Sequence, residues 1–393
     1  MDMKNYIEEV YNKVSIAEGQ STIENYLFEV YIKGPVSMKD LSVKLGIPIP
    51  LVTAIKKEFI KEDILVQKGG VIVSEKGKDY VENQLGYKNL DMKLYNRILE
   101  DDYVMEVDFS DELKLVSEYL NNRPTVDVTI DQSKCTPETS FKRALLALKN
   151  NSLIGKRILC IGDDDLITVA MALLLKRLYK DTIYSKADIH VADIDKRILD
   201  YISSVASKEG LRITLHHHNL KEPFSNDMID SFDAFFTDPP YTISGMNLFL
   251  SRGVSALKKQ PGRMIFFSFG NKSPKDTWEM QNLINRMGLN IINIIPRFNK
   301  YEGAQIIGGV GQMIVLSTTE KAEPIIKEAF NDKIYTGEFR VTERNYQCKE
   351  CGEVIVVGYK KGFLNIEQLK EKGCPKCLSK SFDLKEKKVV KDN

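Results

Sequence analysis

The chain has 393 residues, enough for roughly two to three domains of about 100 to 200 residues each. Hydrophobic residues make up 43% and charged residues 28%, which is typical of a folded globular chain and excludes disordered and fibrous classes. Lys and Arg number 56 against 55 Asp and Glu, so the net charge of +1 does not indicate a dedicated nucleic-acid binder.

The apolar runs of the sequence are short. The longest uncharged one, 166–175, ends at Lys176 and falls well below the roughly 20 residues that span a bilayer. The first ten residues carry acids where a secretory signal carries basic residues, so we expect a cytoplasmic protein. Four of the six cysteines form two CxxC pairs, which indicates a metal site in a reducing compartment rather than a disulfide framework.

Residues 1–88 predict a winged helix-turn-helix-like domain. A helical pattern around Ile23 to Tyr31 stops at Gly34-Pro35, and Ser37 is expected to cap a short helix that ends near Gly46. A further helix follows Pro48, and a hairpin is expected to turn at Gly69-Gly70. The last of these helices mixes basic and acidic side chains, so we favour a supportive or dimerising module over DNA binding.

Residues 89–135 form an acidic connecting segment. Its acids are either a solvated face or a surface that attracts a polycation. They are Glu100, Asp101, Asp102, Glu106, Asp108, Asp111 and Glu112. Thr136 is expected to cap the next helix, with Pro137 at its first position.

Residues 136–330 alternate short apolar strands with helices, which predicts an α/β, Rossmann-like domain with a mostly parallel sheet. The expected strands are RILCIG, DIHVAD, LRITLHH, FDAFFTD, RMIFFSFG, NIINIIP and GQMIVLS, the last of them antiparallel. In such a sheet, ligands bind at the carboxyl ends of the strands.

The residues at these strand ends form a consistent set. The first strand ends in Gly162 followed by Asp163, Asp164 and Asp165, and the third runs into Asn219. Asp193 ends the second strand, where a carboxylate can accept from both ribose hydroxyls; Asp195 is the nearby alternative. The fourth strand ends in the segment Asp238-Pro-Pro-Tyr241.

Three carboxylates in the first turn oppose a pyrophosphate cofactor and favour a positively charged nucleoside, namely a sulfonium. The carboxylate tail of S-adenosylmethionine would be repelled, whereas the aminopropyl ammonium of its decarboxylated form would be attracted. This favours aminopropyl over methyl transfer. One of the three aspartates can simply cap the following helix, but capping does not need three.

The FFTDPPYT segment points to nitrogen alkylation and leaves the substrate open. Asp238 followed by Pro-Pro-Tyr241 is typical of methyltransferases that act on the amines of nucleic-acid bases. The alternative function is therefore an S-adenosylmethionine-dependent N-methyltransferase acting on a base amine. A regulator with an inactive transferase fold would require degenerate strand ends, which this sequence does not have.

Together, GKRILCIGDDDL, DIDKRIL, FFTDPPYT, LFLSRG and IDQSKCTPET closely resemble the branched-chain polyamine synthases, the N(4)-bis(aminopropyl)spermidine synthase family. The resemblance covers roughly residues 129–317. It implies a homodimer that transfers aminopropyl groups from decarboxylated S-adenosylmethionine to the secondary amine of spermidine or a related linear polyamine. The products would be a branched polyamine and methylthioadenosine.

The resemblance also implies roles for individual residues. We expect Asp164 to be the general base, Asp238 to orient the amine, and Tyr241 to wall the site. Asp163 and Asp165 are expected on the ammonium groups, as binding residues for both the donor and the substrate, and Asn219 near the adenine. Asp131 and Glu138, in the IDQSKCTPET segment, complete the expected substrate-binding residues, while Gly162, Asp193 and Asp238 complete those for the donor.

Residues 331–393 are expected to form a zinc ribbon with a Lys-rich tail. Cys348, Cys351, Cys374 and Cys377 form two CxxC pairs separated by 22 residues, the pattern of a structural site with four thiolate ligands. A redox dithiol is the alternative, but its CxxC would lie in a βαβ pattern. His216 to His218 are read as a polar strand end rather than a catalytic metal site, since neighbours on a strand face opposite ways.

Overall fold

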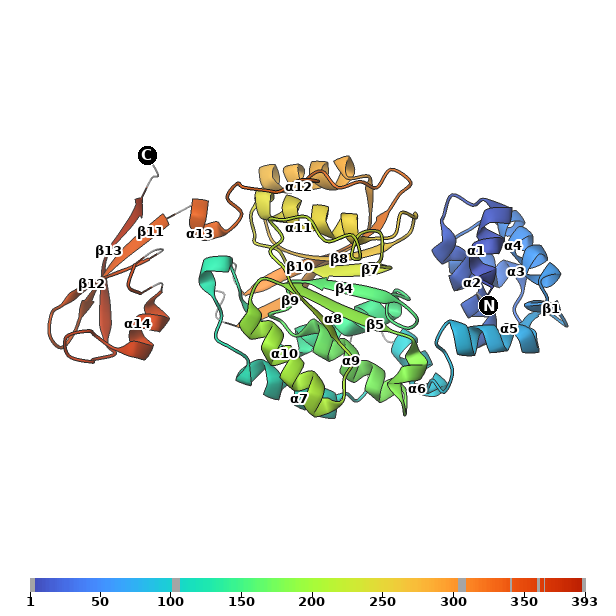
Figure 1. The fold of residues 1–393 in the computed structure, drawn as a ribbon, viewed down its shortest axis with the longest axis horizontal. Coiled ribbons are helices and arrows are strands. Elements are labelled where there is room, and N and C mark those ends of the chain that lie inside the picture. The colour runs from blue at the N-terminus through green and yellow to red at the C-terminus, as the bar shows by residue number, and fades with distance from the viewer. Residues whose placement is uncertain are drawn as a thin grey trace.

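The computed structural model describes residues 4–100, 107–302, 309–339, 341–358, 361–363 and 365–390. Figure 1 shows an N-terminal group of helices on one side of a central sheet and a small C-terminal sheet on the other. Among the described helices, none is both long and apolar enough to cross a membrane.

The N-terminal part contains the helices and the hairpin expected from the sequence. Its elements are α1 (Tyr6–Val14), α2 (Gln20–Lys33), α3 (Met38–Leu45), α4 (Ile49–Lys61), β1 (Leu65–Gln67), β2 (Val71–Val73), α5 (Glu75–Asp79) and the π-helical turn η1 (Tyr80–Gln84). Ser37 caps α3 by accepting from the Asp40 amide, and β1 pairs antiparallel with β2. Classification of this part as a winged helix stays a prediction.

The connecting segment is largely helical. It comprises α6 (Met92–Glu100), α7 (Ser110–Asn122), the 3-10 turn η2 (Val128–Ile130) and β3 (Lys134–Cys135). Asp111 and Glu112 lie in the first turn of α7, where negative charge stabilises the helix dipole. Asp101, Asp102 and Glu106 of the expected acidic face lie outside the described residues.

The central sheet has eight strands in the order β3-β9-β10-β8-β7-β4-β5-β6, which confirms the predicted α/β class. Its remaining strands are β4 (Arg157–Ile161), β5 (Asp188–Asp193), β6 (Thr214–His217), β7 (Ala234–Thr237), β8 (Met264–Gly270), β9 (Leu289–Glu302) and β10 (Val310–Thr318). The five strands from β4 to β8 pair in parallel, whereas β10 runs antiparallel to both β8 and β9. The antiparallel last strand was expected.

Helices cover both faces of this sheet (Figure 1). They are α8 (Pro137–Lys149), α9 (Ile167–Leu178), η3 (Thr182–Ser185), α10 (Lys196–Glu209), α11 (Ile243–Ala256) and α12 (Pro274–Arg286). Alternate strand residues enter different cores: Ile158 and Phe236 pack with α8 to α10, while Leu159 and Phe235 pack with α11 and α12. At Gly253, a Cβ would lie 2.2 Å from the Phe235 ring, so only glycine lets α11 approach β7 this closely.

The C-terminal part is a three-stranded antiparallel sheet in the order β12-β11-β13, preceded by a short helix. Its elements are α13 (Thr336–Phe339), β11 (Val341–Cys348), β12 (Val354–Val357), α14 (Ile366–Lys372) and β13 (Phe382–Val390). Its core is small and includes the cysteines Cys348 and Cys374 among its buried residues.

Candidate active site

The aspartates expected at the strand ends lie around one end of the sheet. Asp163 to Asp165 follow β4, Asp193 ends β5, and Asp238 follows β7. The turn begins at Gly162, whose φ of 73° is in the left-handed region that glycine adopts without strain. A Cβ there would have a single neighbour within 4 Å, the Phe249 ring at 3.9 Å, so the turn leaves open space beside the backbone. This space suits a nucleoside against the turn.

Two backbone amides hold the Asp193 carboxylate in place at the end of β5. Its Oδ2 accepts from the Asp163 amide at 3.0 Å and its Oδ1 from the Asp195 amide at 2.7 Å. Each oxygen keeps a second lone pair, so the carboxylate can still accept from two ribose hydroxyls. Asp195 is already occupied as the cap of α10, as the ion partner of Arg197 and as the acceptor of Gln132. These contacts favour Asp193 over Asp195 for a ribose.

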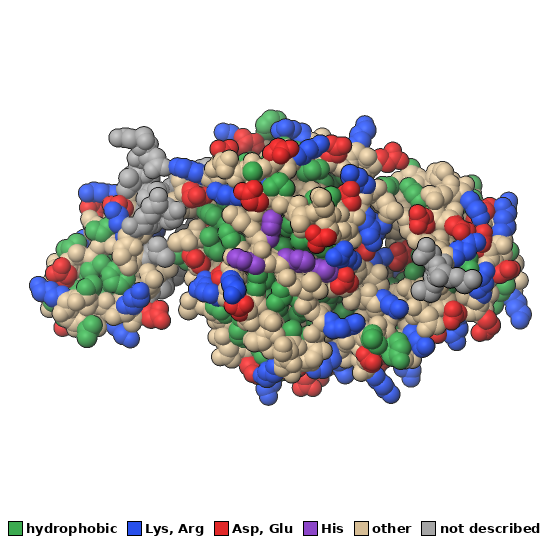
Figure 2. All heavy atoms as spheres, viewed as in Figure 1, with side chains coloured by type: hydrophobic (Ala, Val, Ile, Leu, Met, Phe, Trp, Pro, Cys, Tyr) green, Lys and Arg blue, Asp and Glu red, His purple; other side chains and the backbone are tan. Residues whose placement is uncertain are grey.

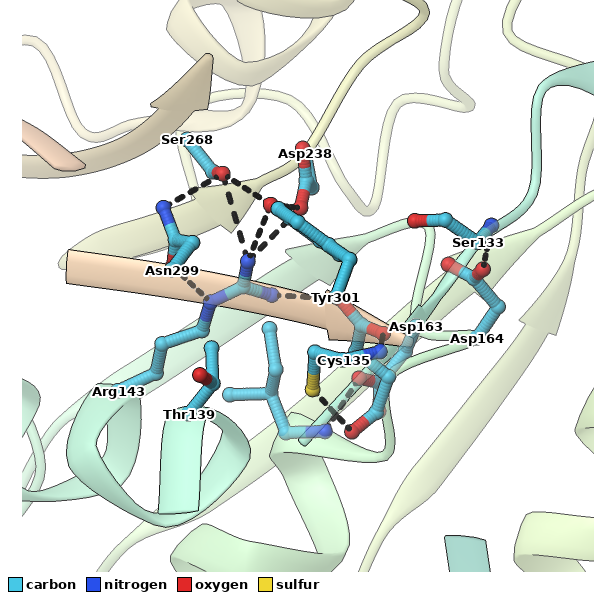
Figure 3. Close-up of polar contacts among 12 residues, drawn as sticks. Ser133, Cys135, Thr139, Arg143, Asp163, Asp164, Asp238, Ser268, Asn299 and Tyr301 are labelled. Carbon is cyan, nitrogen blue, oxygen red and sulfur yellow. Dashed lines mark hydrogen bonds and ion pairs between the residues drawn. The ribbon is translucent and has the colours of Figure 1, made fainter. Parts of the chain in front are cut away.

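Arg143, on α8, is completely buried and joins the ends of two strands. It donates to Asp165 and Asp238 at 2.8 Å each, and Figure 3 shows its guanidinium reaching the polar side chains of the neighbouring strands. The further acceptors are Asn299 Oδ1, Tyr301 Oη and Ser268 Oγ, at 2.8, 2.9 and 3.3 Å. These hydrogen bonds and opposite charges offset the cost of removing the guanidinium from water, and they hold both carboxylates in fixed positions.

Asp164, the middle member of the triplet, makes no hydrogen bond to Arg143 in the described structure, whereas Asp165 does. Its Oδ2 accepts from the backbone amide of Ser133 at 3.0 Å, on the side of the site away from Arg143 (Figure 3). Burial raises its pKa well above the ordinary value, and the nearby carboxylates of Asp165, Asp193 and Asp238 raise it further. A raised pKa makes the ionised carboxylate a stronger base toward the proton of an amine.

Tyr241 lies against the same network. Its hydroxyl donates to Tyr301 Oη at 3.0 Å, and Tyr301 donates in turn to Asp238 Oδ2 at 2.6 Å. The Tyr241 ring packs edge-on against Phe269, and the ammonium of Lys272 lies 5.7 Å from the ring centre. Burial raises the pKa of both tyrosine hydroxyls, so they act as neutral hydrogen-bond groups.

Two aspartates of the triplet, Asp163 and Asp165, accept several hydrogen bonds from within the protein, and their expected contact with ammonium groups stays a prediction. Asp163 is fully buried and accepts from the amides of Ile167 and Thr168 and from the Thr168 hydroxyl, so it caps α9. Asp165 accepts from the Cys135 amide at 2.7 Å and from Arg143, which already neutralises it. Both carboxylates are therefore occupied within the protein.

Other expected residues lie nearer the rim. Asn219 is exposed after β6 and accepts from the Lys221 amide in a turn, and Glu138 is exposed in the first turn of α8. Asp131 accepts from the Thr336 amide at 2.6 Å, which connects the segment before α8 to α13. Burial raises the pKa of Asp131. The structure thus gathers Asp164, Asp193, Asp238 and Tyr241 but does not draw Asn219 or Glu138 in among them.

The three adjacent histidines do not converge. His216 accepts or donates at 2.9 Å to His190 on β5, His217 contacts the Ile194 carbonyl, and His218 contacts the Glu222 carbonyl. Figure 2 shows the histidines together near the middle of one face of the molecule. Among the described residues, the grouping of His, Cys, Asp or Glu that could hold a metal is the cysteine cluster.

In that cluster, the four predicted cysteines meet at one point. All four Sγ atoms lie within 4.8 Å of one another, with 3.5 Å between Cys348 and Cys377 and 3.6 Å between Cys351 and Cys374. Tetrahedral zinc with Zn–S bonds of about 2.3 Å requires sulfurs about 3.8 Å apart. The cluster therefore has the ligands and the spacing of a zinc site.

The sequence did not predict four polar residues that belong to the site, namely Arg143, Ser268, Asn299 and Tyr301. Arg143 stands within the apolar helix FKRALLAL, and Ser268 interrupts the apolar strand IFFSFG. Polar residues in such runs are a signal of buried networks, because an unpaired polar group there would be costly. Nothing in the sequence alone shows which acids they contact.

The parallel sheet with acidic strand ends and an antiparallel strand between β8 and β9 defines a Rossmann-like α/β fold. Residues 111–352 match the family model of the branched-chain polyamine synthase A C-terminal domain. An N(4)-bis(aminopropyl)spermidine synthase from Thermococcus kodakarensis is 33% identical over 76% of this chain and 83% of its own. The chain belongs to the branched-chain polyamine synthase family, which confirms the predicted resemblance.

Two further relatives extend the comparison. An uncharacterized protein from Methanocaldococcus jannaschii is 34% identical over 98% of this chain and 94% of its own length. The crystal structure of the Thermus thermophilus branched-chain polyamine synthase, in complex with N4-aminopropylspermidine and 5'-methylthioadenosine, aligns with a TM-score of 0.48 and 22% identity. That alignment covers 84% of this chain and 95% of the other.

Proposed function

We propose that the chain is an aminopropyltransferase that moves aminopropyl groups from decarboxylated S-adenosylmethionine to the secondary amine of spermidine or a related linear polyamine. The main observation that supports this proposal is the excess of carboxylates at the strand ends. Five aspartates meet there, and of these Arg143 holds only Asp165 and Asp238. A polycationic acceptor and a sulfonium donor with an ammonium tail are both attracted by this charge.

The proposed chemistry assigns the proton to Asp164. A protonated secondary amine has no lone pair, so it first gives its proton to a carboxylate. The nitrogen then attacks the methylene next to sulfur, the carbon–sulfur bond breaks, and its electron pair returns to sulfur to give neutral methylthioadenosine. Asp164 has a raised pKa and lies outside the Arg143 network, whereas Asp238 is fixed by Arg143 and Tyr301 and can orient the amine.

The donor site is proposed beside the turn after β4. Asp193 would accept from the ribose hydroxyls, and the open space at Gly162 would receive the nucleoside. Tyr241 would wall the acceptor side of the sulfonium. Asp163 and Asp165 would act indirectly, by fixing the turn and contributing negative charge.

The test is mass spectrometry of products from spermidine with either decarboxylated or ordinary S-adenosylmethionine. We expect an aminopropyl mass gain with the decarboxylated donor alone. Methyl transfer from the ordinary donor would instead support the nitrogen-methylating alternative.

Asp164→Asn should lower turnover at least about 100-fold while methylthioadenosine still binds, because a general base contributes that much. Asp200→Asn, an exposed acid on α10, is the matched control and should keep wild-type turnover. Normal turnover of Asp164→Asn would refute the assigned base.

For the four-cysteine cluster we propose structural zinc. Four thiolates would complete a tetrahedral site with no open position, so the metal would stabilise the small C-terminal sheet rather than take part in transfer. The family resemblance further supports a homodimer. We also propose a cytoplasmic location, because cysteines that bind metal as thiolates are typical of a reducing compartment.

A further inference from the structure

Arg123 is a buried cation that the proposed mechanism leaves without a role. It follows α7, is 8% exposed, and donates from Nη2 to the Ser133 carbonyl at 2.7 Å. Its Nε and Nη1 are buried and have no hydrogen-bond partner in the described part of the chain. Burying guanidinium donors without acceptors is costly, so a purely structural role explains this arginine poorly.

Ser133 connects this arginine to the expected base. Its carbonyl oxygen accepts from Arg123, while its amide donates to Asp164 Oδ2 at 3.0 Å. The next contacts along the same stretch are similar, since the Cys135 amide donates to Asp165 and the Gln132 side chain to Asp195. Residues 132–135 therefore lie against the acidic strand ends, and Arg123 holds this stretch through the Ser133 carbonyl.

We propose that Arg123 is a positioning residue for Asp164: through Ser133 it fixes the carboxylate beside the amine, and its guanidinium balances the surrounding negative charge. The proposal rests on the proposed function for its catalytic meaning, but the pairing of the two side chains can be tested without turnover.

The charges around Asp164 support this role. Asp165 from the same turn, Asp193 from β5 and Asp238 from β7 all raise the pKa of Asp164, as does burial, whereas Arg123 lowers it. Arg143 reaches Asp165 and Asp238 but makes no hydrogen bond to Asp164 in the described structure. Without Arg123, the Asp164 carboxyl would stay protonated to higher pH and could not accept the proton of the amine.

The first experiment measures kcat/KM for spermidine, at saturating decarboxylated donor, across pH 6.5 to 10 for Arg123→Met, Arg123→Lys and wild type. In Arg123→Met the acidic limb should move upward by about one pH unit, with activity roughly tenfold lower at neutral pH and recovering in alkali. Arg123→Lys should restore most of the limb, and Arg177→Met, an exposed arginine on α9, should match wild type. A uniform loss with an unshifted limb, or no loss, would overturn the proposal.

The second experiment needs no turnover. Urea unfolding midpoints are compared for Arg123→Met, Asp164→Asn and the double variant at pH 7.5. Coupling is expected, because once Asp164 is neutral the loss of Arg123 should shift the midpoint less than it does in wild type. Additive shifts would overturn the pairing. Coupled shifts in a chain that transfers no aminopropyl group would instead reject the proposed function and retain the pairing.

Discussion

Replacing Arg143 by methionine would leave the buried carboxylate of Asp165 and the mostly buried carboxylate of Asp238 without their guanidinium partner. Removing one member of a buried ion pair costs about 3 to 5 kcal/mol, because the remaining charge is desolvated and uncompensated. Here a single arginine serves two carboxylates, so we expect the free energy of unfolding near pH 8 to fall by about this amount.

The sign of the pH dependence separates charge from packing. In the variant, protonation of the freed carboxyls relieves their repulsion in the folded state, so the deficit should shrink at pH 5.5. Arg252 offers a matched control, because it is equally buried but donates to the backbone carbonyls of Leu220, Lys221, Ile326, Lys327 and Glu328. Urea unfolding of Arg252→Met should show a deficit that is the same at both pH values. Equal deficits at both pH values for Arg143→Met as well would refute the reasoning.

Two further predictions concern Asp163 and the cysteines. Burial raises the pKa of Asp163 to about 7, against about 4 in an unfolded chain, so this carboxyl costs the wild type stability as pH rises between these values. In urea unfolding, the stability of Asp163→Asn relative to wild type should therefore rise from pH 5 to pH 8. If the stabilities of the two proteins changed with pH in parallel, the raised pKa of Asp163 would be contradicted. Metal analysis should find about one zinc per chain, lost in Cys351→Ser and retained in the buried control Cys160→Ala, and much less zinc in the wild type would argue against the site.

The sequence predicted the sheet and the position of the site because both depend on local patterns. Short apolar strands such as RILCIG are each followed by a helix, and ligand-binding residues in such folds stand at strand ends. The cysteine cluster was predicted for the same reason, since the spacing of CxxC pairs reports the geometry of their ligands.

The sequence did not predict which partner each aspartate of the GDDD turn contacts. Consecutive side chains in a turn point in different directions, and each aspartate met a different partner: the start of α9 for Asp163, Ser133 for Asp164, and Arg143 for Asp165. Ser133 and Arg143 lie 31 and 22 residues before the aspartates that they contact. Only the three-dimensional packing of α8 and β3 against the turn shows which acid stays available for chemistry.

The N-terminal helices share their hydrophobic core with the central sheet. Buried side chains of α1, α2 and α4, such as Val10, Leu27 and Phe59, belong to the same cluster as Ile158 and Val191 of the sheet. The Lys156–Glu24 ion pair and the Asn151–Asn25 hydrogen bond cross the same boundary. Cutting the chain near residue 88 would therefore uncover an apolar surface on each fragment. We expect the first 88 residues and the sheet to unfold together in one cooperative transition, because each part loses buried apolar contacts without the other.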